Sequence, residues 1–224
     1  MRRRLFLMPL LAAGIGVSAL LAGCEAEVEG ELEIRDIVER ETRGLFATSV
    51  VTTDDCERDN RSADREGSAG WTTWVLSGVF PDTRYRSCRE RDSGATTTFR
   101  NMFVFDAMPG EALSGLSHVN VKLHERTLSV GLPPYVQENI ERVRKQAGLD
   151  ETAAITTRLT LINNEDEPFA YRVARFEESD EVDWGERQVL APSDRVSLDY
   201  PVALAERVFA DGWAPLLRIE SSGD

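Results

Sequence analysis

The chain has 224 residues, of which 42% are hydrophobic and 29% are charged, so it is long enough and apolar enough to bury a substantial core. It contains 26 basic and 39 acidic residues, which gives a formal net charge of −13. An acidic field of this size makes nucleic acid a poor partner and also disfavours anionic lipid surfaces.

The N-terminus has the order of an export signal. Arg2 to Arg4 form a basic head, and Leu5 to Gly23 is an uncharged stretch rich in Leu, Ala and Gly. This order is typical of a cleaved leader. The alternative is an uncleaved anchor helix, because ~19 residues at ~1.5 Å each give ~28 Å, which spans a bilayer. Pro9, Gly14 and Gly16 disfavour such a helix.

The end of this leader, Leu21-Ala22-Gly23-Cys24, resembles the lipobox of bacterial lipoproteins. The resemblance implies cleavage between Gly23 and Cys24, with fatty acyl chains on Cys24, which becomes a diacylated thioether and then the acylated N-terminus. We therefore expect residues 1–23 to be a signal peptide. Residues 24–224 are expected to be a single lipid-anchored α+β domain, with a subdivision near residue 150 as the alternative. The leader holds three basic residues, so the mature charge is 23 − 39 = −16.

Glu25 follows the modified cysteine. In Gram-negative lipoproteins, sorting rules hold back mainly chains with Asp at this place, so the resemblance implies a periplasm-facing anchor in the outer membrane rather than the inner one. A Gram-positive cell surface is the alternative. Two or three acyl chains hold a protein firmly to a bilayer, and no second long apolar run follows.

Two further cysteines, Cys56 and Cys88, follow the lipidation site. An exported domain with one remaining pair most simply forms a disulfide. The closed loop of ~32 residues would stabilise the fold by ~3–4 kcal/mol in the chain-entropy model. Free thiols or a metal pair are the alternatives, and no ligands near either cysteine support them.

Periodicity predicts the secondary structure along the chain. Residues 25–34 alternate between glutamates and apolar or small residues, which indicates a strand with one wet face that begins almost at the lipid. The helix at residues 134–148 is the clearest, since Val136, Ile140 and Val143 share a stripe between Pro134 and Gly148. Further elements are expected as follows: strands at 45–51, 85–88, 96–105, 118–124, 127–132 and 216–219; a loop at 54–70; helices from 71 to 80 and from 201 to 210; and hairpins at 155–173 and 187–198.

Strands follow strands with few helices between them, and no regular β-α-β alternation is present. The sequence therefore predicts an α+β fold, with a mainly antiparallel β-sheet, two or three helices and one disulfide.

The residue types that usually carry chemistry do not converge in this sequence. His118 and His124 share a strand face but lie ~20 Å apart, too far to hold one metal ion. No serine sits in a nucleophile elbow, and no phosphate or dinucleotide motif is present. The acidic turn at residues 163–167 lacks the spacing of a calcium loop, so calcium is a minor alternative. We expect no catalytic residues, no metal and no cofactor.

Two clusters remain open to more than one interpretation. Four arginines flank Cys88, namely Arg84, Arg86, Arg89 and Arg91. They suit a phosphate, a sugar acid or an acidic partner. The interpretation we favour is that the interleaved Glu90 and Asp92 and the acids around Cys56 balance them, with the two charged loops pairing across the disulfide. Trp71 and Trp74 form either core or a contact patch, and we expect core.

The segment from Gly78 to Cys88, with Phe80, Pro81 and Asp82, resembles part of an uncharacterised family of phage- and prophage-associated lipoproteins. An early strand after the lipidated cysteine and the strand, helix and hairpin run from Leu128 to Val173 match as well. The resemblance implies a small accessory domain anchored in the cell envelope, with no known activity.

Taken together, these features predict a non-enzymatic binding or interaction module in the cell envelope. Its partners would be the membrane, through the lipid, and an envelope protein. The alternatives are a hydrolase of envelope polymers, a structural stabiliser of an envelope complex, or a phage factor that excludes further phage.

Overall fold

The computed structural model describes residues 26–40, 42–59, 65–106, 119–147, 154–176 and 182–220. The predicted signal peptide, Gly23, Cys24 and His118 lie outside these ranges. Twelve strands and four helices occupy the described residues. In chain order they are β1 (Ala26–Glu33), α1 (Ile34–Glu39), β2 (Arg43–Thr53), α2 (Ala69–Val79), β3 (Arg84–Arg91), β4 (Gly94–Asp106), β5 (Val119–His124), β6 (Thr127–Gly131), α3 (Pro134–Ala147), β7 (Ile155–Ile162), β8 (Phe169–Arg175), β9 (Asp183–Trp184), β10 (Gln188–Leu190), β11 (Arg195–Tyr200), α4 (Val202–Asp211) and β12 (Trp213–Ile219).

The strands form one mixed sheet in the order β10-β8-β12-β6-β5-β4-β2-β1-β7-β11. β3 pairs with the first half of β4, and β9 pairs with β8. Most neighbours are antiparallel, as predicted, but β1 with β7 and β4 with β5 are parallel. The sheet is therefore mixed, and the helices number four instead of two or three. Strands from before and after residue 150 lie side by side in it.

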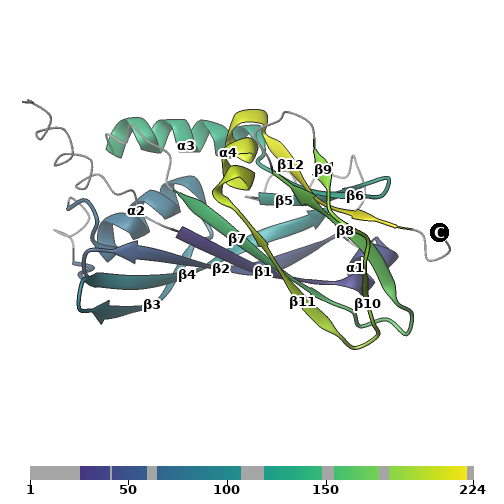
Figure 1. Ribbon diagram of the computed structural model, residues 1–224. Coiled ribbons are helices and arrows are strands. Elements are labelled where there is room, and N and C mark those ends of the chain that lie inside the picture. Colours follow the sequence, from purple (N-terminus) through teal and green to yellow (C-terminus); the bar gives the residue numbers. More distant parts are fainter. Residues whose placement is uncertain are drawn as a thin grey trace, which may run out of the picture.

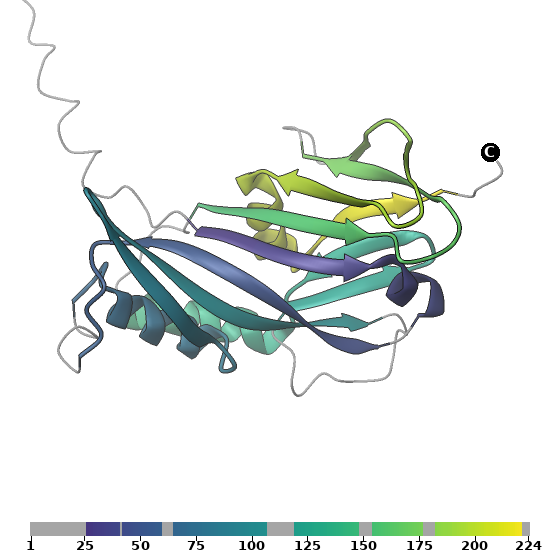
Figure 2. The ribbon, with the colours of Figure 1, turned by 90° about the horizontal axis from the view of Figure 1, so that it is seen from below.

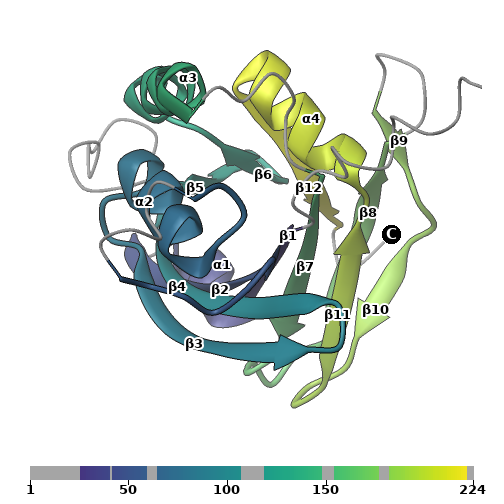
Figure 3. The same cartoon turned by 90° about the vertical axis from the view of Figure 1, so that its left-hand side faces the viewer.

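The sheet is strongly curved, and α2, α3 and α4 lie on its concave side (Figures 1 and 3). α2 packs on α3 and β3, while α4 packs on β7 and β12. Figure 2 shows the long strands β2 and β4 running the length of the molecule, with β3 along the outer edge of β4. The curvature gives the sheet an inner face that the three helices cover.

Alternation in β1 places its small and apolar residues on this inner face, as predicted. Leu32 is 1% exposed, whereas Glu31 on the opposite face is exposed. The predicted helix at 134–148 is confirmed as α3, with Val136 and Val143 buried. Trp71 is buried, as expected, but Trp74 is 41% exposed, so only one of the two tryptophans belongs to the core.

The predicted disulfide is present and joins Cys56, in the loop after β2, to Cys88 of β3. It fastens the edge strand to the loop that leads into α2. Thr97 of β4 donates a hydrogen bond to the Cys88 sulfur at 3.2 Å.

Both predicted hairpins are wrong in their pairing. β7 pairs with β11, in the register Leu159 opposite Leu198, while β8 pairs with β10. The turns between β7 and β8 and between β10 and β11 instead lie against each other. Asn163 joins them, because its backbone N–H donates to the carbonyl of Asp194 and its carbonyl accepts from Ser193. Alternation correctly predicted which residues face inward, but partner choice depended on contacts between distant turns.

Candidate ligand cavity

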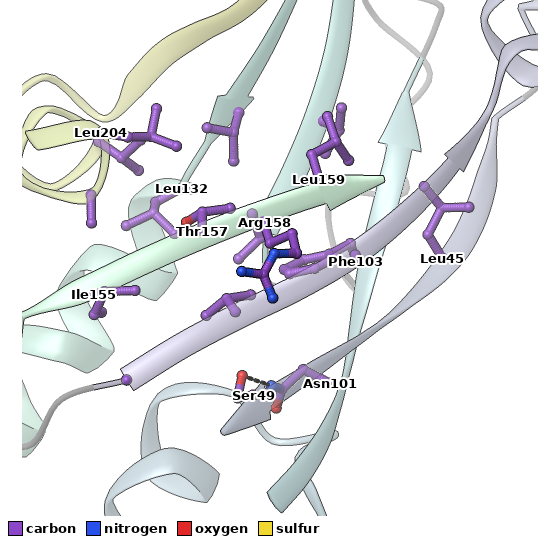
Figure 4. A pocket seen from close by; sticks show the side chains of 18 of the residues that line it. Leu45, Ser49, Asn101, Phe103, Leu132, Ile155, Thr157, Arg158, Leu159 and Leu204 are labelled. Atoms are coloured by element: carbon purple, nitrogen blue, oxygen red, sulfur yellow. Dashed lines mark hydrogen bonds between the residues drawn. The ribbon is translucent and has the colours of Figure 1, made fainter. Parts of the chain in front are cut away.

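A cavity lies between the concave face of the sheet and the helices α2 and α4 (Figure 4). The space open to the centres of water-sized molecules is about 190 Å³. By comparison, a dry cavity of ~150 Å³ lined by aliphatic side chains already binds benzene. The space is therefore larger than a packing defect, and it fits part of a hydrocarbon chain.

Inward-facing positions of neighbouring strands build its walls. β1 contributes every second residue from Ala26 to Leu32, and β7 contributes Ile155, Thr157 and Leu159. These strands run parallel, with Ala26 opposite Ile155, so both begin at the same end of the sheet. Because these first residues both line the cavity, it extends to the end of the sheet where β1 begins.

The cavity lining is almost entirely apolar. Helix α4 covers it with Leu204, Ala205, Val208 and Phe209, and α2 adds Leu76 and Phe80 at its end. Among the described lining residues, only the outward-facing pair Glu31 and Arg158 carries a formal charge. An apolar, pre-formed concavity with few polar groups is the usual form of a site for small hydrophobic ligands.

Gly30 leaves room at the middle of the β1 wall. A Cβ atom built at this position would lie 3.7 Å from Cε2 of Phe103, which is an ordinary contact, so nothing in the backbone demands glycine there. Its neighbours across the sheet are Ala47 and Leu159. The small residues at positions 30 and 47 therefore keep space that larger side chains would fill.

One buried polar cluster faces the cavity from β2 and β4. The amide nitrogen of Asn101 donates to the hydroxyl oxygen of Ser49, and the Thr83 hydroxyl donates to the Asn101 carbonyl oxygen at 2.9 Å. Ser49 and Asn101 are 6% and 8% exposed. Ser49 thus acts as an acceptor toward Asn101 and retains its own O–H for another acceptor, such as a carbonyl oxygen of a ligand.

This lining does not resemble a hydrolytic site. Of the residues that the structure describes around the cavity, Glu31 is the only carboxylate and none is a histidine or cysteine. Ser49 contacts an amide instead of a base, so nothing there would activate it as a nucleophile. His124 is exposed at the end of β5, and Cys56 and Cys88 are bonded to each other.

Two of the acids around Cys56 pair with an arginine outside β3. Arg65 pairs with both Asp55 and Glu57, the latter at 3.0 Å. Our favoured interpretation, pairing across the disulfide, is therefore not borne out for these two acids. Arg58 instead stacks over the ring of Tyr85, 3.6 Å from its centroid.

Polar groups of the acidic turn after β7 bind other groups of the protein. Asn163 is fully buried, and its amide nitrogen donates to two backbone carbonyls, those of Glu167 and Leu190. Glu165 pairs with Arg35 at 2.9 Å. Over the described ranges, no group of three or more potential ligands is placed to hold a metal ion.

The periodicity of the strands predicts which residues face inward, but it does not indicate a cavity. The same apolar alternation results whether a curved sheet is filled by side chains or left partly open. Comparisons of the chain with protein-family models, with curated proteins and with solved structures found no match. No helix in the described ranges has both the length and the apolar character needed to cross a bilayer.

Proposed function

We propose that this chain is a lipid-anchored, non-enzymatic binding module of the cell envelope, and that its cavity holds the acyl chain of a membrane lipid. The observation that carries the proposal is the apolar cavity between the concave sheet and α4, which reaches the end of the sheet where β1 begins. Burial of hydrocarbon in an apolar space is favourable by ~0.8 kcal/mol per CH₂.

The position of the expected anchor favours a membrane lipid as the ligand. Ala26 lines the cavity, and Cys24 precedes it by two residues, which span at most ~7 Å. An anchor at Cys24 keeps this end of the sheet next to the bilayer. A chain leaving the bilayer there would have a short path into the cavity, and the Ser49 hydroxyl would be available to its ester carbonyl.

The test measures binding of a fatty acid carrying a dansyl group to the mature chain. We expect saturable binding with a blue-shifted emission. Gly30→Leu should weaken it by roughly 200-fold, because four added carbons displace about four methylenes of ligand at ~0.8 kcal/mol each. Gly44→Leu is the matched control: this glycine lies on the outer face of the neighbouring strand β2, where an added Cβ would meet a side-chain atom no closer than 3.5 Å.

Absence of saturable binding to the unchanged chain would refute the ligand class. Equal loss in the Gly30 and Gly44 variants would place the probe elsewhere on the protein. The anchor has its own measurement, because mass spectrometry of the mature protein should find acyl groups on Cys24. Cys24→Ser should remove these groups and leave the domain folded.

A further inference from the structure

On β1, β3 and β4, arginines and glutamates of the outer face lie in separate places. β3 pairs with β4 in a register that places Arg84 opposite Arg100 and Arg89 opposite Thr96. The alternate residues of β4, including Ala95 and Phe99, are buried on the inner face. The positions of Arg84, Arg89, Arg91 and Arg100 therefore share the outer face, and we call these four residues the arginine face.

Strand alternation separates the arginine face from the nearest acid of its own strand. Glu90 falls on the opposite side of β3 from Arg89 and Arg91, and Asp92 lies in the turn to β4. Within the described ranges, no carboxylate forms an ion pair with Arg84, Arg89 or Arg91. All three are exposed.

The acids of β1 do not neutralise this face either. Glu27 and Glu29 point outward two strands away from β4. Both pair with Arg158 of β7, at 3.1 and 3.0 Å, and Arg158 also pairs with Asp199. One arginine thus serves three carboxylates in this acidic half of the outer face, which keeps a net negative charge on the side away from β3.

The register places the arginine face at the anchored end of the molecule. Ala26 lies level with Val51, Thr97 and Cys88 on successive strands, so β3 is three strand spacings, about 14 Å, from the start of β1. Arg89 and Arg91 lie beyond this level, near the turn to β4. Figures 1 and 2 show the β3–β4 turn at the end of the sheet where β1 begins.

We propose that the arginine face lies on the anionic surface of the membrane in which the chain is anchored. The net charge of −16 opposes contact at a distance, but at physiological salt the field of distant charges decays within ~8 Å. Next to the bilayer, the local arginines dominate the interaction. Each cation near an anionic surface raises the affinity for that surface roughly five-fold. Phe46, which is 57% exposed beneath the Arg100 guanidinium, adds an apolar contact to the same face. The net charge of the chain predicts poor binding to an anionic surface, whereas the local placement of the arginines favours such binding.

The proposal uses the membrane anchor of the proposed function but not the cavity. It is tested with the lipidated protein attached through Cys24 to vesicles of phosphatidylcholine, with or without phosphatidylglycerol. Hydrogen–deuterium exchange is measured in the peptide that covers the β3–β4 turn. We expect slower exchange on the anionic vesicles. Arg89→Gln/Arg91→Gln should lower the ratio of contacting to non-contacting protein roughly 25-fold, at about five-fold per arginine, and abolish the difference between the vesicles.

The matched control is Arg187→Gln/Arg195→Gln, which removes the same charge from exposed positions. Arg195 lies opposite Ile162, level with the far end of β1, so this variant should retain the difference. Equal exchange on both vesicles, or equal loss in both variants, overturns the proposal, and so does failure of the chain to attach through Cys24. Inorganic phosphate that slows exchange without vesicles at the same ionic strength would indicate a small-anion site and also overturn it. None of these results alters binding of the dansyl fatty acid, so failure of the cavity proposal is recognised separately.

Discussion

Asn163→Ala is the substitution expected to be most damaging outside the apolar core. Asn163 is fully buried, and its amide nitrogen donates to the carbonyls of Glu167 and Leu190 at 3.0 and 2.9 Å. Its side-chain oxygen accepts from the backbone N–H of Glu165 at 3.1 Å. The alanine variant loses all three hydrogen bonds and leaves the buried Leu190 carbonyl without this partner.

The expected loss follows from the number of groups left unsatisfied. A typical hydrogen bond contributes ~1 kcal/mol net, while a buried group left unpaired costs ~1–3 kcal/mol. Water can reach the backbone groups of the half-buried Glu165 and the exposed Glu167, so the buried Leu190 carbonyl dominates the effect. We expect the free energy of unfolding to fall by about 3–4 kcal/mol. This is a large part of the ~5–15 kcal/mol available to a domain.

Urea denaturation followed by circular dichroism measures this change. Asn164→Ala is the control, because Asn164 is only half-buried and binds the Arg35 backbone and Glu33 near the surface. It should cost about 1 kcal/mol. Equal losses in the two variants would refute the reasoning that Asn163 holds the two turns together. A loss confined to Asn163 should be accompanied by faster hydrogen exchange around Leu190, since β10 then separates from β8.

Two further predictions concern packing and pH. Gly78→Val should destabilise the fold by ~1–3 kcal/mol, because a Cβ at position 78 would lie 2.8 Å from Cγ2 of Val143 on α3. The control in the same urea titration is Gly44→Val, which should be close to neutral because its added Cβ meets only ordinary contacts. Burial raises the pKa of Tyr200, whose hydroxyl donates to the Leu216 carbonyl. Because the folded pKa exceeds the unfolded value of ~10, stability from Tyr200 is complete below pH ~10 and is lost above it, at up to ~1.4 kcal/mol per pH unit. Tyr200→Phe should therefore lessen the fall in unfolding free energy between pH 9 and 11, and an unchanged slope would contradict this assignment.

The sequence by itself determined the local structure of much of this protein. Alternation placed Leu32 inside and Glu31 outside, and the apolar stripe of Val136 and Val143 located α3. The pairing of Cys56 with Cys88 followed from their number. These features depend on periods of 2 and 3.6 residues and on a simple count, which neighbouring residues fix without reference to the rest of the chain.

Only the tertiary structure decided which strands pair. The sequence read Asn163 as the turn of a hairpin, whereas the buried amide binds a second turn, which lets β7 pair with β11 and β8 with β10. The parallel pairing of β1 with β7 likewise joins segments more than a hundred residues apart. Alternation has the same form whichever neighbour a strand takes, so pairing depends on long-range contacts.

The cavity and the arginine face also required the fold. In the sequence, the residues around Gly30 would look the same in a filled core. Only the curvature of the sheet and the position of α4 leave the space open. In the sequence, Arg89 and Arg91 alternate with Glu90 and appear neutralised by it. The pleat sends that acid to the other face, and the position of β3 at the edge of the sheet leaves the arginines exposed together.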